Sequence, residues 1–340
     1  MSPAIKPSPR FASLEIDSAD SSVQTLTPPN NLQRFEGVAF STSGDVLGVA
    51  TADTNTIYLF RKAPDGLFEK TPYGSISGAK SGLNYPHDLS FARSGDTELL
   101  AVAQRVGSIA VYANNRVDDH YGTEPVFEIC GAEARLDAPD GVAFVPPKNA
   151  YLAACNFQTS CISFYRKTTN SSIEFQRQPD FVLNHEAVCG PDGLAFTRCG
   201  KWLAIANHRN NTVSIFQRGN WILSGGKLKY GPTPVTVIED LELRYPHSVA
   251  FTPKTNHLVV TNAGANYLSV YQPQRRGLRM QWSQSPVVQH RVAPDEIFRH
   301  GENATNKMEG GPKGVAIHNN MLAVCSPEFG IRIYSFRETF

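Results

Sequence analysis

The sequence lacks the features that mark several large functional classes. No apolar run approaches the roughly 18 residues that a membrane-spanning helix needs. Residues 1–30 are rich in serine and proline and contain no apolar core of a secretory signal. The formal net charge is only +1 over 340 residues, whereas nucleic acids and anionic membranes usually select a strongly basic surface. We therefore expect a cytoplasmic protein that binds neither nucleic acid nor membranes.

Cysteine and motif content narrow the chemistry further. The six cysteines include no Cys-x-x-Cys pair, and a chain of this length needs no disulfide scaffold, so we expect no zinc ribbon. Cys155 and Cys161 flank a predicted hairpin loop and could approach each other, although we favour small buried side chains. The sequence also lacks a Gly-x-Ser-x-Gly elbow, a phosphate-binding loop and a His-Glu-x-x-His helix. We expect no organic cofactor.

What the chain does contain is a six-residue phrase that recurs along its whole length. The second residues of successive phrases lie between 51 positions (36 to 87) and 66 positions (247 to 313) apart. A turn, a second strand, a polar loop and a third strand that ends in an aromatic residue follow each phrase. The phrases are Phe35–Phe40, Pro86–Phe91, Pro139–Phe144, Pro191–Phe196, Pro246–Phe251 and Pro312–Ile317.

This repeat predicts an all-β protein, a six-bladed β-propeller of four-stranded antiparallel blades. Fourth strands are predicted at 74–77, 126–130, 180–183, 235–238 and 287–292, which leaves one blade incomplete. We expect residues 22–27 to complete the last blade, so that an N-terminal strand closes the ring and covers an open edge.

The domain organisation follows from that closure. We expect residues 1–21 to be an extended or poorly ordered arm and residues 22–340 to be a single domain. The rival is a seven-bladed ring with its extra blade in residues 273–311. That stretch lacks the phrase, so we favour an insertion in blade five.

The second position of each phrase carries an ionisable residue. In a propeller these positions lie at one level around the axis, next to the loops that join second and third strands. Two interpretations are open: a ligand or metal site at the channel mouth, or a network of ion pairs that neutralises itself. Three carboxylates with two imidazoles suit a divalent ion such as Mn, Fe or Zn better than Ca. The ring consists of Glu36, His87, Asp140, Asp192, His247 and Lys313.

Loops beside this ring add further candidates for ligand binding. Asn156, Asn207 and Asn262 each open such a loop, and asparagine there is also explained by its role in turns. Arg105, His208 and Arg209 could bind an anionic group or be solvated loop tips, and Lys313 joins the same candidate set. The basic insertion at 273–311 could form a lid over the channel or lie on the outer edge of blade five.

The phrase Pro-Asp-Gly-Val-Ala-Phe and the strands that follow it resemble those of NHL and SMP-30/gluconolactonase-like propellers, from Leu32 to Phe336. The resemblance implies a divalent metal (Ca, Mn, Zn or Fe) at the channel mouth. Glu36, Asp140 and Asp192 match the positions of its ligands. His247 departs from the pattern, because it lies where a further carboxylate or amide is expected, and we count it as a fourth candidate ligand. The sequence departs from that pattern in having Val38 instead of proline and no Pro-Asn-Gly phrase.

Three functions fit these residues. A metal-dependent hydrolase or lactonase would act on a small polar ester or lactone, with Asp140 or Asp192 as base or ligand and His87 or His247 moving the proton. A non-catalytic propeller would bind a protein or small ligand through the loops at the mouth. A metal-free lyase or cyclase would use Glu36, His87 and His247.

Overall fold

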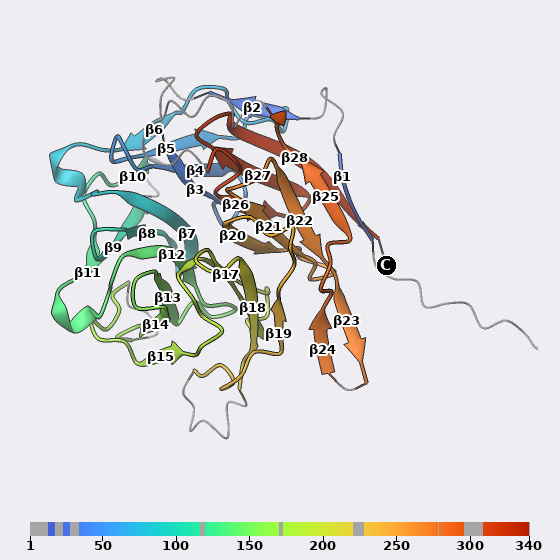
Figure 1. Cartoon of the computed structure of the whole chain (residues 1–340). Coiled ribbons are helices and arrows are strands. Elements are labelled where there is room, and N and C mark those ends of the chain that lie inside the picture. Colours follow the sequence, from blue (N-terminus) through green and yellow to red (C-terminus); the bar gives the residue numbers. More distant parts are fainter. Residues whose placement is uncertain are drawn as a thin grey trace, which may run out of the picture.

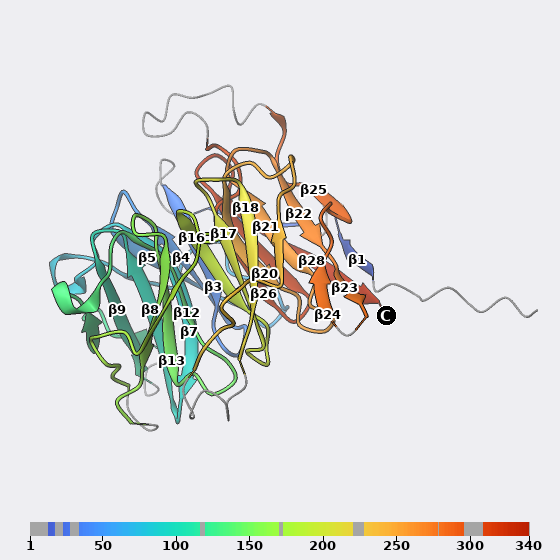
Figure 2. The same cartoon turned by 60° about the horizontal axis from the view of Figure 1, so that its bottom comes forward.

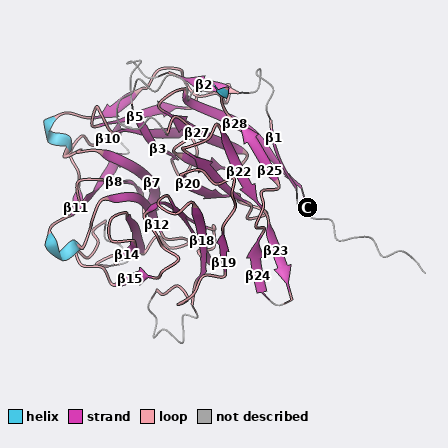
Figure 3. Ribbon diagram, in the orientation of Figure 1, coloured by secondary structure: helices cyan, strands magenta, loops and turns pink. Residues whose placement is uncertain are grey.

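The computed structural model confirms the six-bladed β-propeller, in which the blades surround a central axis (Figure 1). It describes residues 13–17, 23–27, 34–115, 120–169, 173–219, 228–277, 279–295 and 309–339. Strands make up nearly all of the regular structure of these residues, which also includes short 3₁₀ turns at Ala79–Ser81 and Ala132–Ala134 (Figure 3). No helix among these residues is long and apolar enough to cross a membrane.

The first three blades are formed by residues 35–184. Blade one consists of β3 (Phe35–Phe40), β4 (Val46–Thr51), β5 (Thr56–Arg61) and β6 (Gly74–Ile76). Blade two consists of β7 (Pro86–Ser94), β8 (Thr97–Gln104), β9 (Ser108–Asn115) and β11 (Phe127–Ile129), with β10 (His120–Tyr121) on the end of β9. Blade three consists of β12 (Pro139–Phe144), β13 (Tyr151–Asn156), β14 (Cys161–Arg166) and β15 (Phe181–Asn184).

The remaining blades complete the ring. Blade four consists of β16 (Pro191–Phe196), β17 (Trp202–Asn207), β18 (Thr212–Gln217) and β19 (Thr236–Ile238). Blade five consists of β20 (Pro246–Phe251), β21 (Leu258–Asn262), β22 (Tyr267–Tyr271) and β25 (Val288–Arg291). Blade six consists of β26 (Val315–His318), β27 (Met321–Ser326), β28 (Gly330–Thr339) and, from the N-terminal region, β2 (Gln24–Leu26).

Blade packing explains the apolar runs of the second strands. β4, β13 and β17 are buried along their whole length, because each lies between two neighbouring blades and has no solvent face. The aromatic residue at the fifth position of each third strand is buried as well. Tyr112 and Tyr165 donate their hydroxyls to the carbonyls of Ser81 and Ala134 at 2.6 Å. These bonds tie the outer turns to the core.

The N-terminal strand closes the ring as expected. β2 pairs antiparallel with the first part of β28, with Thr25 opposite Arg332. Of residues 1–21, which were expected to form an extended or poorly ordered arm, only 13–17 belong to the described residues, and there β1 (Ser13–Ile16) pairs with the last part of β28. Leu14 is buried there, so its apolar side chain stabilises the pairing of this strand with β28. β28 therefore carries two short strands along its outer edge.

Glycine after the ring position allows the inner strands to approach closely. A Cβ on Gly141 would lie 2.5 Å from the carbonyl oxygen of Asp192, and one on Gly193 would lie 2.5 Å from that of His247. Real Cβ atoms do not come this near to a backbone oxygen, so the phrase needs glycine here to keep the channel narrow.

The insertion in blade five contains a separate hairpin, β23 (Pro273–Arg276) with β24 (Arg279–Trp282), before the blade ends in β25. Figure 2 shows this hairpin beside the outer part of blades four to six. The part of the insertion that the structure describes thus supplies a fourth strand and a hairpin. Arg299 and His300 lie outside the described residues.

Candidate functional site

The six ring residues converge at one end of the channel, and all are buried. Each follows the first residue of an inner strand, except Lys313, which lies just before β26. In the five blades from β3 to β20, pairing with the second strand shifts directly after that first residue. Such a bulge re-aims a side chain away from the sheet. The exposed fractions are Glu36 1%, His87 1%, Asp140 0%, Asp192 4%, His247 4% and Lys313 2%.

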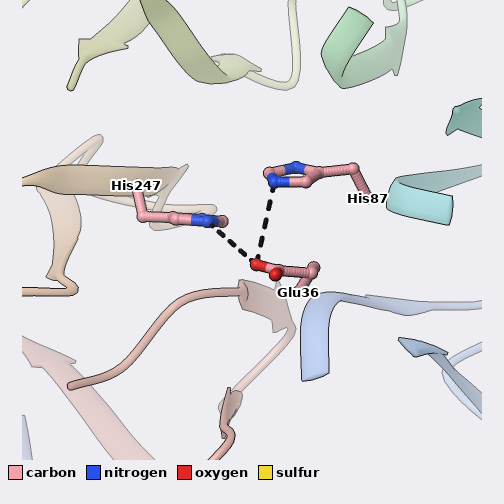
Figure 4. A group of neighbouring side chains, drawn as sticks. All are labelled: Glu36, His87 and His247. Atoms are coloured by element: carbon pink, nitrogen blue, oxygen red, sulfur yellow. Dashed lines mark ion pairs between the residues drawn. The ribbon is translucent and has the colours of Figure 1, made fainter. Parts of the chain in front are cut away.

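Glu36 is surrounded by cationic and imidazole groups. Its Oε2 lies 3.3 Å from His247 Nε2 and 3.7 Å from His87 Nε2 (Figure 4). The same oxygen lies 2.8 Å from Lys313 Nζ, and Oε1 accepts a bond from Arg34 Nε. Burial alone would raise the pKa of Glu36, but the charge of Lys313 and the hydrogen bond from His247 hold that pKa well below its usual range. Glu36 is therefore ionised and compensated.

The two ring histidines are neutral and stacked. Their ring centroids lie 5.1 Å apart and their planes are inclined by 17°. Burial lowers the pKa of His247 to about 4 and that of His87 well below its usual range. His87 Nδ1 lies 3.1 Å from the carbonyl oxygen of Asp140, which can only accept, so we assign the proton of His87 to Nδ1. This tautomer leaves no lone pair on Nδ1 for a metal.

Asp140 and Asp192 form the other side of the ring. Asp140 Oδ1 lies 3.5 Å from Arg105 Nε, and Asp192 lies 3.4 Å from His208 Nδ1 and 3.7 Å from both ring histidines. Both oxygens of Asp140 and Oδ1 of Asp192 have no hydrogen-bond partner among the described residues. Burial raises the pKa of Asp140 to about 7, and burial together with Asp140 raises that of Asp192 well above its usual range.

Glu309 belongs to the site but carries no signal in the repeat. Its carboxylate lies 3.1 Å from His208 Nε2 and 3.4 Å from Lys313 Nζ, which links the loop of blade four to the ring. Burial would raise its pKa, but the bond to His208 and the charge of Lys313 lower it to about 2. Sequence reasoning missed Glu309 because it lies in the insertion, four residues before Lys313.

The three asparagines that open the loops are fully buried and bonded within the protein. Their Oδ1 atoms accept hydrogen bonds of 3.0 Å from the backbone N–H groups of Asp137, Cys189 and Arg244. Each of these donors lies two residues before the inner strand of the same blade. Their Nδ2 groups donate to serine hydroxyls of the third strands. Asn156, Asn207 and Asn262 thus act as latches between a loop and the strand entry beside it, which is the structural explanation that the sequence left open.

A rim of arginine and aromatic side chains lies over the ring. Arg34 and Arg105 each contact a ring carboxylate, yet their side chains are 21% and 32% exposed. Arg34 lies over Tyr85 at 5.4 Å, while Arg105 and Arg209 lie over Phe157 at 5.1 and 5.0 Å. The sequence had singled out Arg105 and Arg209; Arg34, Tyr85 and Phe157 were missed, although each lies beside a residue that the repeat had marked.

The metal ligands expected from the sequence fall into two groups. Donor atoms lie within 4.8 Å of one another in the group Glu36, His87 and His247, and again in the group His87, Asp140 and Asp192. In the first group, the ammonium of Lys313 already bonds the Glu36 oxygen. In the second, the unpaired carboxylate oxygens fit a cation, whereas His87 Nδ1 does not in the tautomer assigned above.

Comparison with known proteins places the fold in the propeller class. No protein-family model matches the chain, and no curated protein matches it either. Among solved structures, the Myceliophteria thermophila Cps50 (Swd1) β-propeller domain matches with a TM-score of 0.58 and 14% identity over 92% of this chain and 99% of that one. The RRP9 WD40 repeats match with a TM-score of 0.59 and 11% identity over 95% and 100%. These matches concern the fold, and they do not support the NHL or SMP-30 resemblance, nor hydrolase or lactonase activity.

Proposed function

We propose that this protein is a non-catalytic propeller that binds an acidic group of a protein or small ligand over the channel mouth. One observation carries the proposal. Each ring side chain is almost fully buried and lies within 4 Å of an oppositely charged or ionisable partner, while the guanidinium groups above it reach solvent.

The burial of the ring argues against direct chemistry on a substrate. A general acid or base must come within hydrogen-bond reach of the reacting group. Glu36 is 1% exposed, and its two oxygens are bonded to Lys313 and Arg34. The same contacts weigh against the lyase or cyclase interpretation, since Glu36 would be its central base. An internally paired ring instead fixes the positions of the blades and of the rim.

The rim offers the chemistry for an anion. A planar guanidinium binds carboxylate or phosphate through two parallel hydrogen bonds. Arg34 and Arg105 flank Tyr85, whose hydroxyl experiences the charges of both, and burial is the main reason why its pKa is raised. Phe157, held between Arg105 and Arg209, adds an apolar contact for the group that carries the charge.

The test measures anion binding by calorimetry with three probes: inorganic phosphate, benzoate and a glutamate-rich peptide. We expect at least one probe to bind, and the double variant Arg34→Gln/Arg105→Gln to weaken that binding at least tenfold. Benzoate or phosphate binding would indicate a small ligand, and peptide binding a protein. Because the two arginines also contact the ring, Phe157→Leu provides a second variant that leaves the ion pairs intact, and Arg337→Gln is an exposed control. Failure of all three probes would overturn the proposal.

A second candidate, metal-dependent hydrolysis, has one observation in its favour: both oxygens of Asp140 and Oδ1 of Asp192 are buried without a hydrogen-bond partner among the described residues. A divalent ion held by these carboxylates would polarise a carbonyl of an ester or lactone. In this reading, His87 would have to give up its bond to the Asp140 carbonyl to join the ligands. The residues themselves would orient the substrate, with Arg105 on the solvent side of Asp140.

Elemental analysis separates the two candidates. Near-stoichiometric Mn, Zn, Fe or Ca in the purified protein, lost in Asp192→Asn, would support the hydrolase and oppose the non-catalytic proposal. Metal-free protein after loading with Mn, Zn and Ca, together with no turnover of chromogenic esters or lactones, would leave the binding propeller.

A further inference from the structure

The β23–β24 hairpin is fixed against the outer edge of blade four. Trp282, at its end, packs edge-on against Trp202 at 5.5 Å and against Phe251 at 5.8 Å, and its indole N–H donates to the carbonyl of Asn256 at 3.0 Å. Just beyond, the Gln284 amide donates to the carbonyl of Val237 in the outermost strand of that blade. These contacts therefore fix the hairpin in place. Figure 1 shows it beside β19, at the periphery of the propeller.

A cavity of about 380 Å³ lies between the hairpin and blade four. Its lining residues lie at those ends of β17, β18 and β19 that are on the face opposite the channel mouth. The turns between first and second strands lie on the same face. Three of its lining residues are exposed cations, Lys201, Arg275 and Arg279, and no aspartate or glutamate lines it. Its apolar contacts come from Trp202, Val235 and Met280.

The cations of this groove form no ion pair within the part of the chain that the structure describes. Among the described residues, no carboxylate lies within 4.0 Å of Lys201, Arg275 or Arg279 in an ion pair. Arg276 and Arg279 are also directly opposite each other in the hairpin. Like charges in that relation destabilise a strand pair. Since the net charge of the whole chain is only +1, this concentration of positive charge is local.

We propose that this groove binds a segment of a partner protein in which acidic residues flank one large apolar residue. The acidic side chains pair with Arg275, Arg279 and Lys201, which relieves the repulsion within the hairpin. The apolar side chain packs against Met280, Val235 and the ring of Trp202, where Lys201 already lies 5.0 Å over the indole. A nucleic acid is disfavoured because the positive charge is confined to one groove with an apolar floor.

The test uses fluorescence anisotropy with labelled nine-residue peptides. Their central residue is Ile, Leu, Met, Phe or Trp, flanked by aspartate and glutamate, and matched peptides carry asparagine and glutamine instead. We expect at least one acidic peptide to bind at least tenfold more tightly than its neutral match. The variant Arg275→Glu/Arg279→Glu should abolish that preference, whereas Arg93→Glu, an exposed change on the same face of blade two, should leave the affinity within twofold.

Three results would overturn the proposal: no acidic peptide binds, the neutral peptides bind equally well, or a single-stranded DNA of similar charge binds more tightly than any peptide. Tryptophan emission checks that the variant keeps Trp202 and Trp282 buried, and Met280→Ala offers a milder change that should weaken binding without altering charge. Because the groove and the channel mouth lie on opposite faces, the outcome is independent of the Arg34 and Arg105 test.

Discussion

The two sides of the buried ring show how neighbours, rather than burial, decide the charge of a carboxylate. Glu36 and Asp140 occupy equivalent positions in blades one and three and are equally inaccessible. Lys313 and Arg34 bond Glu36, and its pKa is held well below the usual range, whereas Asp140 has only Arg105 at 3.5 Å and its pKa rises to about 7. Carboxyl groups at equivalent positions of a repeat can thus have pKa values shifted in opposite directions.

The residues that make this difference come from outside the repeated positions. Arg34 lies two residues before the first inner strand, and Glu309 lies in the insertion and helps to hold Lys313. The repeat therefore supplies a symmetric set of ionisable side chains, and irregular segments break that symmetry. Variants at Glu36, Asp140 and Asn156 test this comparison.

The largest expected effect comes from Glu36→Gln. It leaves Lys313 buried without its closest carboxylate, and removing one partner of a buried pair typically costs about 3–5 kcal/mol. We expect a loss of this size in the free energy of unfolding, measured by urea denaturation. The control Glu69→Gln changes an exposed residue and should cost less than about 0.5 kcal/mol.

A double-mutant cycle sharpens the result. Glu36→Gln combined with Lys313→Met removes both partners, so the pair should lose less stability than the sum of the single changes, by about 1–3 kcal/mol. Additive losses would mean that the two groups do not interact, and the account of this half of the ring would then be wrong.

The second prediction concerns pH in chelator-treated protein. The pKa of Asp140 is about 7 in the folded state and about 3.9 when unfolded. Between these values the folded protein keeps a proton that the unfolded chain releases, so this carboxyl makes stability fall as pH rises from 4 to 7. His87 and His247 have lowered pKa values, so their contribution to stability is lost as pH falls, which is opposite to the contribution of Asp140. The effect of Asp140 is therefore measured as a difference between two stability curves.

Asp140→Asn provides that difference. Relative to the wild type, the variant should gain roughly 2–4 kcal/mol between pH 4 and pH 7, measured from denaturation at each pH. Asp45→Asn, on an exposed turn of blade one, should leave the curve unchanged. A flat difference would show that Asp140 is ionised throughout. Disappearance of the gain when Mn²⁺ or Ca²⁺ is added to both proteins would instead favour the metal candidate.

The smallest effect is expected from Asn156→Ala, which removes the latch on the segment that leads to Asp140. The N–H of Asp137 and the hydroxyl of Ser163 lose their partner, and an unsatisfied buried group costs about 1–3 kcal/mol. The matched control is Asn184→Ala, which changes an exposed asparagine of the same blade. Equal losses in the two variants would mean that the latch contributes nothing.

Much of the fold could be predicted because each blade repeats the same solution. The phrase marked every inner strand, and an aromatic residue marked each third strand. Even the short β6 and β19 were therefore expected within one or two residues of their observed ends. β1 was not expected. Its four residues, Ser13–Ile16, bear no mark of the repeat; Leu14 is buried in the core and Ile16 packs against it half-buried.

The site was predictable in its positions and not in its pairing. The spacing of the phrases placed Glu36, His87 and Lys313 at one level, which the structure bears out. Which carboxylate receives which cation depends on side-chain distances of a few ångströms, and no sequence pattern encodes these. The sequence also left open whether the basic insertion covers the channel or lies outside it. Arg275 and Arg279 lie against blade four and not over the channel.

The pairing of β2 with β28 has a consequence for synthesis of the chain. Thr25 is made among the first residues of the described chain and Arg332 among the last, yet they are neighbours in one sheet. While the ribosome is still translating blades one to five, β2 has no partner, and the ring stays open with exposed inner edges. Closure must therefore wait until residues 330–339 have left the ribosome, which makes the nascent propeller most vulnerable to aggregation just before its last strand emerges.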